Sequence, residues 1–430
     1  MGESTKDMTR GNPRQMIISF AIPLMLGNVF QQMYTVMDSV IVGRGIGVEA
    51  LAALGTSDWL SFTAIGGITG IAQGFSVLIA QRFGAKDEKG MKKTVAMSVW
   101  TGAGVTLLFM ALFLGNLKIL LNFLRVPENI WQSAYNYLFI LLVGLVATAL
   151  YNISSGILRA MGDSKTPLKA MVTAAVTNIV LDLIFVMVFH WGVEGAGIAT
   201  VLAQFCSGGI CCIQLKKYGV WKMSKEDWKY DFCVVKKLLG LGLPVAFQNI
   251  IIGFGGIAIQ YVINGFGFLY VAGFTATNKL YGLFELAAVS LGYATSSFVG
   301  QNLGAGEYQR IKDGAKISAQ LSVVIALAVG AVLLIFGHEI LGIFISPTEK
   351  QAEEVLKIAY NYLAVMGATL IILYLLHIYR SALQGMGDTV IPMFSGIAEM
   401  IMRISIAFFL PFVMGKKAFT LQRRERGWVL

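Results

Sequence analysis

The run QQMYTVMDSVIVG (31–43) places a carboxylate, Asp38, inside a stretch that is otherwise fit to face lipid. Between residues 15 and 43, Asp38 is the only charged side chain. An ionised aspartate at the centre of a bilayer costs about 2.5–3.5 kcal/mol even on the insertion scales that give the lowest values. We therefore expect Asp38 either to be a satisfied structural carboxylate or to take part in a proton or ion pathway, and we favour the second.

A second polar set lies further along the chain. Asn178 and Asp182 stand four residues apart and so share one face of a helix, about one turn from each other. If they converge with Asp38 and the hydroxyl of Thr200 inside one helical bundle, they form a proton network or supply oxygen ligands to a hard cation such as Na⁺. For Asn178 and Thr200, hydrogen bonding that merely joins helices is an equally good interpretation.

The composition indicates which elements must position these residues. The 430 residues are 56% hydrophobic and 13% charged, whereas soluble domains carry roughly 25% charged residues. The four cysteines show neither paired nor metal-ligand spacing, and no cleavable signal peptide is visible. Eleven segments are long and apolar enough to be membrane-spanning helices: 15–43, 51–80, 94–116, 134–158, 170–190, 193–215, 238–264, 270–298, 317–337, 358–379 and 393–414.

The positions of Lys and Arg predict the orientation. With the N-terminus inside the cell, the cytoplasmic segments hold 22 of these residues and the opposite loops hold 5. The net charge of +10 is thereby explained by topology, so we expect no nucleic-acid partner and a multi-pass protein of the cell membrane. Residues 415–430 break the rule, because they carry five basic residues and would emerge outside. This predicts either a missing twelfth span or a chain end that is not the natural one.

The chain also repeats itself. QRFGAK (81–86) corresponds to QNLGAG (301–306), AYNYL (134–138) recurs at 359–363, and AMGDSKTP (160–167) corresponds to GMGDTVIP (385–392). The offsets of 220 to 225 residues divide the chain into an N-terminal lobe (1–215), a cytoplasmic linker (216–237) and a C-terminal lobe (238–430). Six spans return the chain to the starting side, so the two lobes are parallel repeats. The fold class predicted is an all-α integral membrane protein with two pseudo-symmetric six-helix lobes, the second lacking its twelfth helix.

These motifs resemble those of multidrug and toxic compound extrusion (MATE) transporters. The similarity rests on QxMYxxxD in the first span, the GAKD loop after the second, RAMGDSKTP after the fourth and the two-lobed repeat. It implies ion coupling at the matching residues Asp38, Asn178, Asp182 and Thr200, which is also the possible Na⁺ site, and a cavity near Gln31, Tyr137 and Asn152. Spans seven and ten contain no acidic residue. In this respect the chain resembles the DinF-like branch of the family rather than the relatives that resemble NorM.

In the second lobe, Glu399 and Arg403 predict a structural ion pair, and His377 is expected in the core or at an interface. Glu285 and Lys279 lie six residues apart and do not share one helix face.

No P-loop motif occurs, so transport must draw on an ion gradient. We predict an antiporter, not an enzyme, that acts as a monomer without a cofactor and exports lipophilic, cationic drug-like compounds in exchange for H⁺ or Na⁺. Three alternatives remain open: a lipid-linked or polysaccharide flippase of the same superfamily, an intramembrane aspartyl hydrolase, and a truncated copy that does not transport.

Overall fold

A computed structural model describes residues 5–124, 126–264, 268–344 and 352–413. Its described residues are almost entirely helical, which confirms the all-α class. The helices of the first half are α1 (Pro13–Gly45), α2 (Val48–Gly84), α3 (Glu88–Phe123), α4 (Glu128–Val143), α5 (Leu145–Ala160), α6 (Lys165–Asp182), the π-helix η1 (Leu183–Val188) and α7 (Gly192–Lys217). Those of the second half are α8 (Phe232–Asn264), α9 (Phe268–Gly304), α10 (Tyr308–Phe344), α11 (Ala352–Gly385) and α12 (Val390–Val413).

Each of the eleven predicted spans overlaps one of these helices or, for 134–158, the pair α4 and α5. Within the described ranges, nine helices are long and apolar enough to cross a membrane, or ten if α4 and α5 together form one bent span. The predicted missing twelfth span concerns residues after 413, which lie outside the described residues.

Two irregularities were not predicted. The fourth span bends by 41° between α4 and α5, at Gly144, where a Cβ would overlap the Val201 side chain of α7. The fifth span changes from α-helix to π-helix directly after Asp182. Single π-turns within helices are frequent at functional sites, because they re-aim the side chains beside them.

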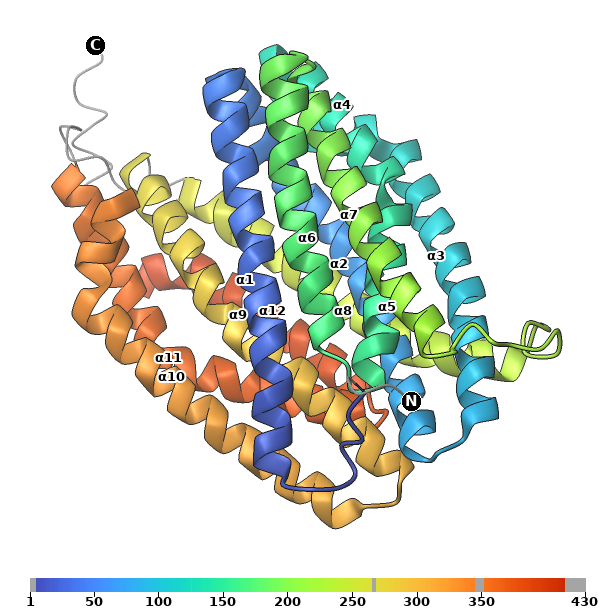
Figure 1. Cartoon of the computed structure of the whole chain (residues 1–430). Coiled ribbons are helices and arrows are strands. Elements are labelled where there is room, and N and C mark those ends of the chain that lie inside the picture. The colour runs from blue at the N-terminus through green and yellow to red at the C-terminus, as the bar shows by residue number, and fades with distance from the viewer. Residues whose placement is uncertain (1–4, 125, 265–267, 345–351, 414–430) are drawn as a thin grey trace, which may run out of the picture.

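The turns α2–α3, α5–α6 and α9–α10, together with the segment 218–231 that joins the halves, lie on one end of the bundle, which we call the linker face (Figure 1). In Figure 1 the helices of the first half, blue to green, and those of the second half, yellow to red, meet toward this face and spread apart away from it. The helices that pack across the halves are chiefly α2 against α8, and α1 and α2 against α9.

The repeated motifs form the contacts at the linker face. A Cβ on Gly84 would overlap the carbonyl oxygen of Gln301, and a Cβ on Gly304 would overlap that of Gln81. The equivalent glycines of the two repeats thus make equivalent contacts, each with a backbone carbonyl oxygen near the end of the other half's helix. In the repeated GD turns, Asp163 accepts hydrogen bonds from the backbone N–H of Thr166, and Asp388 accepts from that of Ile391.

The segment before α1 also joins the halves. Met8 is fully buried, and its backbone N–H donates to Gln301 Oε1 (2.8 Å), while Asn302 and Arg310 donate to its carbonyl oxygen (3.2 and 3.0 Å). Gln301 in turn donates to the carbonyl oxygen of Ala160 at the α5–α6 turn (2.9 Å). These bonds connect the end of α9 with the first half at the linker face.

Arg159 and Arg380 directly follow the predicted spans 134–158 and 358–379, so they were counted among the 22 cytoplasmic Lys and Arg residues, but the structure places them elsewhere. Arg159 and Arg380 are buried, at 8% and 6% exposure, within α5 and α11. Arg159 lies over the ring of Tyr293 (4.8 Å to the centroid). The helices are longer than the apolar runs that predicted them, so a charged residue next to a run can still lie inside the bundle.

Candidate functional site

Asp38 and Asp182 come from the neighbouring helices α1 and α6, which pack along each other in the first half. Asp38 is 6% exposed, and Asn178 and Asp182 are fully buried. Asp38 stands seven residues before the end of α1, so at 1.5 Å per residue it lies about 10 Å from the helix end opposite the linker face. The sequence prediction of deep carboxylates on these two spans agrees with this burial.

The oxygens of these residues lack hydrogen bonds. Among the described residues, no partner reaches Asp38 Oδ1, Asn178 Oδ1 or either carboxylate oxygen of Asp182, and all four atoms are buried. Leaving a buried acceptor unsatisfied costs about 1–3 kcal/mol, and more for a charged group. Four such atoms on two adjacent helices mark a polar site whose oxygens can accept hydrogen bonds from water or bind a proton or a cation.

Thr200 and Tyr137 adjoin the same site. Asn178 Nδ2 donates to Thr200 Oγ1 (3.3 Å), which links α6 to α7 and leaves the Asn178 oxygen unused. Tyr137 of α4 is 7% exposed and lies within electrostatic range of both Asp38 and Asp182. The structure therefore brings five predicted residues, from four helices, into one region of the first half.

The other two predicted cavity residues are placed differently. Gln31 is exposed on α1, within hydrogen-bond range of the Tyr34 hydroxyl. Asn152 is half-buried on α5, where its side chain donates to the Thr148 carbonyl oxygen of its own helix (2.9 Å).

Sequence reasoning missed a third carboxylate. Asp58 of α2 lies within electrostatic range of Asp38. It also lies within electrostatic range of Lys279 of α9, which belongs to the other half. It falls inside the predicted span 51–80, so a count of charges within spans would have found it. Tyr34 was missed as well; its hydroxyl lies within range of the Gln204 side chain, which accepts a short hydrogen bond from Thr148.

The buried charges of the second half are paired. The predicted Glu399–Arg403 ion pair is confirmed, and Arg380 adds a second cation at 2.9 Å from Glu399. Glu285 lies 3.3 Å from His377 Nε2, which places His377 at a contact between α9 and α11. The buried acids of the two halves thus have different environments: Glu399 and Glu285 of the second half lie against basic side chains, whereas Asp38 and Asp182 of the first half have oxygens without hydrogen-bond partners among the described residues.

A small cavity of about 130 Å³ lies where the halves meet. Gln73 of α2 donates to Gln384 of α11 (2.9 Å), and Gln384 donates to Gln248 of α8 (3.2 Å), so a chain of amides crosses its wall. Drug-sized pockets measure roughly 300–1,000 Å³, so this cavity is too small to be one.

The described residues contain no group of three or more His, Cys, Asp or Glu side chains arranged to hold a metal ion. Two carboxylates with an amide and a hydroxyl, which is the arrangement around Asp38 and Asp182, remain suited to a proton or to a weakly bound monovalent cation.

Comparison with known proteins agrees with the repeat and with the fold. The MatE family profile matches residues 23–184 and again residues 244–409, one match in each half. The probable multidrug resistance protein YpnP of Bacillus subtilis is 32% identical over 83% of this chain and 80% of its own length. The probable multidrug resistance protein NorM of Thermotoga maritima is 25% identical over 92% of this chain and 85% of its own length.

Two solved structures share the architecture. A MOP superfamily transporter from Pyrococcus furiosus, for which a binding pocket of reversed polarity is described, superposes with a TM-score of 0.88 at 24% identity, over 95% of this chain and 91% of that one. A multidrug resistance MATE transporter in an outward-facing conformation superposes with a TM-score of 0.87 at 24% identity, over the same shares. At this identity the likeness establishes the fold, and it confirms the predicted two-lobed architecture.

Proposed function

The chain belongs to the MATE family of multidrug efflux transporters, and from that premise we propose that it is a secondary active antiporter of the cell membrane. It exports lipophilic, cationic drug-like compounds in exchange for H⁺ or Na⁺. The single observation that carries this proposal is the group of four buried oxygens without partners at Asp38, Asn178 and Asp182.

Alternating access fits the contacts between the halves. The packing of Gly84 and Gly304 and the bonds of Met8 and Gln301 close the linker face, while the helices spread apart at the other end. We place the N-terminus and the linker face in the cytoplasm, from the excess of Lys and Arg there. The described conformation is then the one in which the cytoplasmic end is closed, and rocking of the two halves would open that end and expose the site to the inside.

The exchange follows from the chemistry of the acids. A proton or Na⁺ that arrives from outside neutralises Asp38 and completes the bonding of the Asp182 and Asn178 oxygens. Neutralisation removes the attraction for a cationic drug, which leaves to the outside. After the halves rock, the ion dissociates inward and the carboxylates are free to bind the next drug. Because ion and drug compete for one set of charges, the exchange is obligatory.

The preference for cations rests on charge. Asp38, Asp58 and Asp182 lie within electrostatic range of one another or of a shared neighbour, Tyr137, and the cation in range of this group is Lys279, on the other half. This group of three acids within an apolar lobe attracts a lipophilic cation more than an anion or a neutral compound.

The test is gradient-driven ethidium transport by the purified protein in liposomes, with H⁺ and Na⁺ gradients imposed separately. We expect Asp38→Asn to reduce transport to the level of protein-free liposomes, because the amide cannot exchange a proton and binds Na⁺ weakly. The matched control is Asp313→Asn, the same change at an exposed position of α10, which should transport as the unchanged protein does. Transport by Asp38→Asn at the rate of the control would refute the proposal, and the gradient that drives the unchanged protein identifies the ion.

A further inference from the structure

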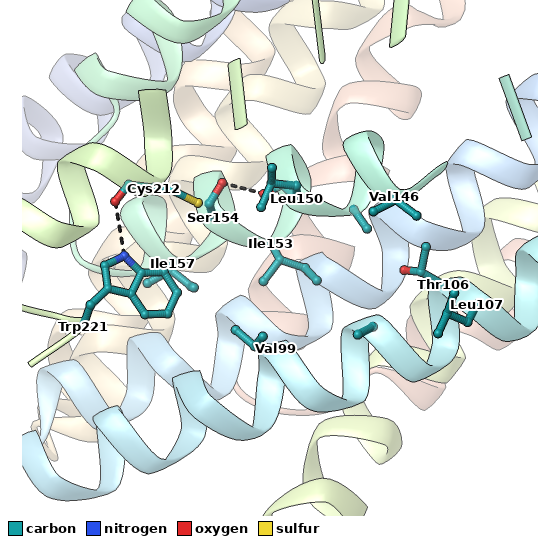
Figure 2. Close-up of a pocket in the computed structure, with 12 residues that line it drawn as sticks. Val99, Thr106, Leu107, Val146, Leu150, Ile153, Ser154, Ile157, Cys212 and Trp221 are labelled. Carbon is teal, nitrogen blue, oxygen red and sulfur yellow. Dashed lines mark hydrogen bonds between the residues drawn. The ribbon is translucent and has the colours of Figure 1, made fainter. Parts of the chain in front are cut away.

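A cavity on the outside of the first half lies away from the acids. It is a groove of about 340 Å³ between α3, α5 and α7, and its lining residues come from these helices and from the segment that follows α7 (Figure 2). This volume falls within the range of about 300–1,000 Å³ typical of ligand sites, so the groove is larger than an ordinary packing gap.

The arrangement of the helices produces the groove. α3 and α7 both pack on α5 and scarcely touch each other, so one face of α5 forms the floor. That floor presents Leu150, Ile153 and Ile157, while α3 contributes Ala103 and Leu107 as a wall. Leu107 is 53% exposed and Leu150 is 37% exposed, so the groove opens toward the outer surface of the bundle, which faces lipid in a membrane-spanning protein.

The groove offers hydrocarbon surface only. The hydroxyl of Ser154 donates to the Leu150 carbonyl oxygen (2.6 Å), and that of Thr106 donates to the Gly102 carbonyl oxygen (2.7 Å), so both are used within their own helices (Figure 2). A drug cation or a polar peptide would find no partner here. An alkyl chain has no hydrogen bonds to lose when it enters the groove. It exchanges contact with water or loosely packed lipid for contact with a fixed apolar wall.

One end of the groove is closed by the indole of Trp221, whose Nε1–H donates to the Cys212 carbonyl oxygen (3.2 Å, Figure 2). Positive charge gathers beyond this end. Lys216 stands one turn after Cys212 on the same face of α7, and Lys222 directly follows Trp221; both are exposed. The stretch 216–237 carries seven Lys and three acidic residues. It also exposes Trp228 and Tyr230, aromatic residues of the kind that lie at the level of lipid headgroups.

We propose that this groove is a binding site for an anionic phospholipid. One acyl chain occupies the groove along α5, and the phosphate headgroup lies beside Lys216 and Lys222. The combination of a dry, alkyl-lined groove with basic residues at one end fits a phospholipid better than it fits a free fatty chain or a free phosphate. The site is separate from the ion and drug site, and it attaches lipid to the segment that joins the two halves.

The test is native mass spectrometry of the detergent-purified full chain, titrated with palmitoyl-oleoyl phosphatidylglycerol or with the corresponding phosphatidylcholine. We expect the unchanged protein to retain phosphatidylglycerol in preference. Ala103→Trp fills the groove from α3 and should abolish that preference. Its matched control is Ala111→Trp, the same change on the same helix at an exposed position that does not line the groove.

The headgroup contact is tested by the double variant Lys216→Gln/Lys222→Gln. Each lysine near an anionic lipid surface strengthens attraction about fivefold, so phosphatidylglycerol retention should fall by more than tenfold while phosphatidylcholine retention is unchanged. Lys312→Gln/Lys316→Gln, on exposed positions of α10, makes the same charge change and should have no effect. Equal retention of both lipids by the unchanged protein, or equal phosphatidylglycerol retention by Ala103→Trp and Ala111→Trp, would overturn the proposal. Both results are independent of transport, so a failed transport assay does not bear on them.

Discussion

The reciprocal packing of Gly84 and Gly304 predicts that one methyl group can change the balance between the two states of the transporter. In the described conformation, a Cβ at Gly84 of α2 would overlap the backbone carbonyl oxygen of Gln301 in α9. Backbone cannot rotate out of the way as a side chain does. In Gly84→Ala the linker face can therefore accommodate the methyl group only if the two halves move apart at this face.

The expected size follows from the cost of overpacking. Forcing an extra methyl group into a well-packed contact costs about 1–3 kcal/mol. The cost applies to the state in which the linker face is closed and is relieved when that face opens. Since 1–3 kcal/mol corresponds to about a 5- to 150-fold change in an equilibrium, Gly84→Ala should shift the protein strongly toward the state open at the linker face.

The distance between spin labels on the two halves measures this shift. Lys89 of α3 and Lys312 of α10 are exposed near the linker face on opposite halves, and labels there, in a background without the native cysteines, should report a longer distance in Gly84→Ala. Gly104→Ala is the control, because a Cβ there meets nothing within 4 Å. If folded Gly84→Ala gives the same distance distribution as Gly104→Ala, then this contact does not hold the linker face closed and our account of the closure is wrong.

Two further predictions concern single buried contacts. Thr200→Val removes the hydroxyl that accepts a hydrogen bond from the Asn178 side chain, at a cost of about 0.5–1.5 kcal/mol, and should lower gradient-driven transport. Thr200→Ser keeps the hydroxyl and should transport as the unchanged protein does. Equal transport by both variants would exclude the hydroxyl from the site. Arg380→Met removes one of the two cations beside the buried Glu399. It should lower the free energy of unfolding, measured by thermal unfolding, by about 3 kcal/mol. This value is near the lower limit for a broken buried ion pair because the second cation remains. The exposed Lys312→Met should leave the unfolding temperature unchanged, and an equal loss in both would contradict the assignment.

The sequence was sufficient to predict the repeated motifs and the charged residues that stand out in apolar segments. Long, continuously apolar runs predicted the helices. Asp38 was identified because an ionised carboxylate in such a run has a high free-energy cost in a membrane. The repeated QRFGAK and AMGDSKTP segments were interpreted as shared architecture, and the structure gives each copy the same contact. Asp163 and Asp388 both bind the first backbone N–H groups of the next helix.

Features that depend on packing between distant segments could not be predicted. The pairing of Glu285 with His377 joins residues 92 positions apart on different helices, and no local spacing signals it. Arg380 was misplaced for the same reason, since its burial depends on α12 lying beside the end of α11. The π-helix after Asp182 and the bend at Gly144, where the backbone lies close to Val201 of α7, leave the hydrophobic pattern unchanged. Asp58 is different, because its signal was present in the sequence and was overlooked.

The two halves of a duplicated chain treat buried charge in opposite ways, and this difference links the site to the motion. In the second half, Glu399 forms ion pairs with Arg380 and Arg403, and Glu285 lies beside the imidazole of His377, so each of these two acids has a partner of opposite or neutralising character within the protein. In the first half, Asp38 and Asp182 keep oxygens without partners, and each such oxygen costs about 1–3 kcal/mol until something binds it. A ligand can shift a conformational equilibrium only by the difference in its binding free energy between the two states. We therefore propose that the half whose acids lack partners is the half in which a bound ion changes the free energy of one state relative to the other.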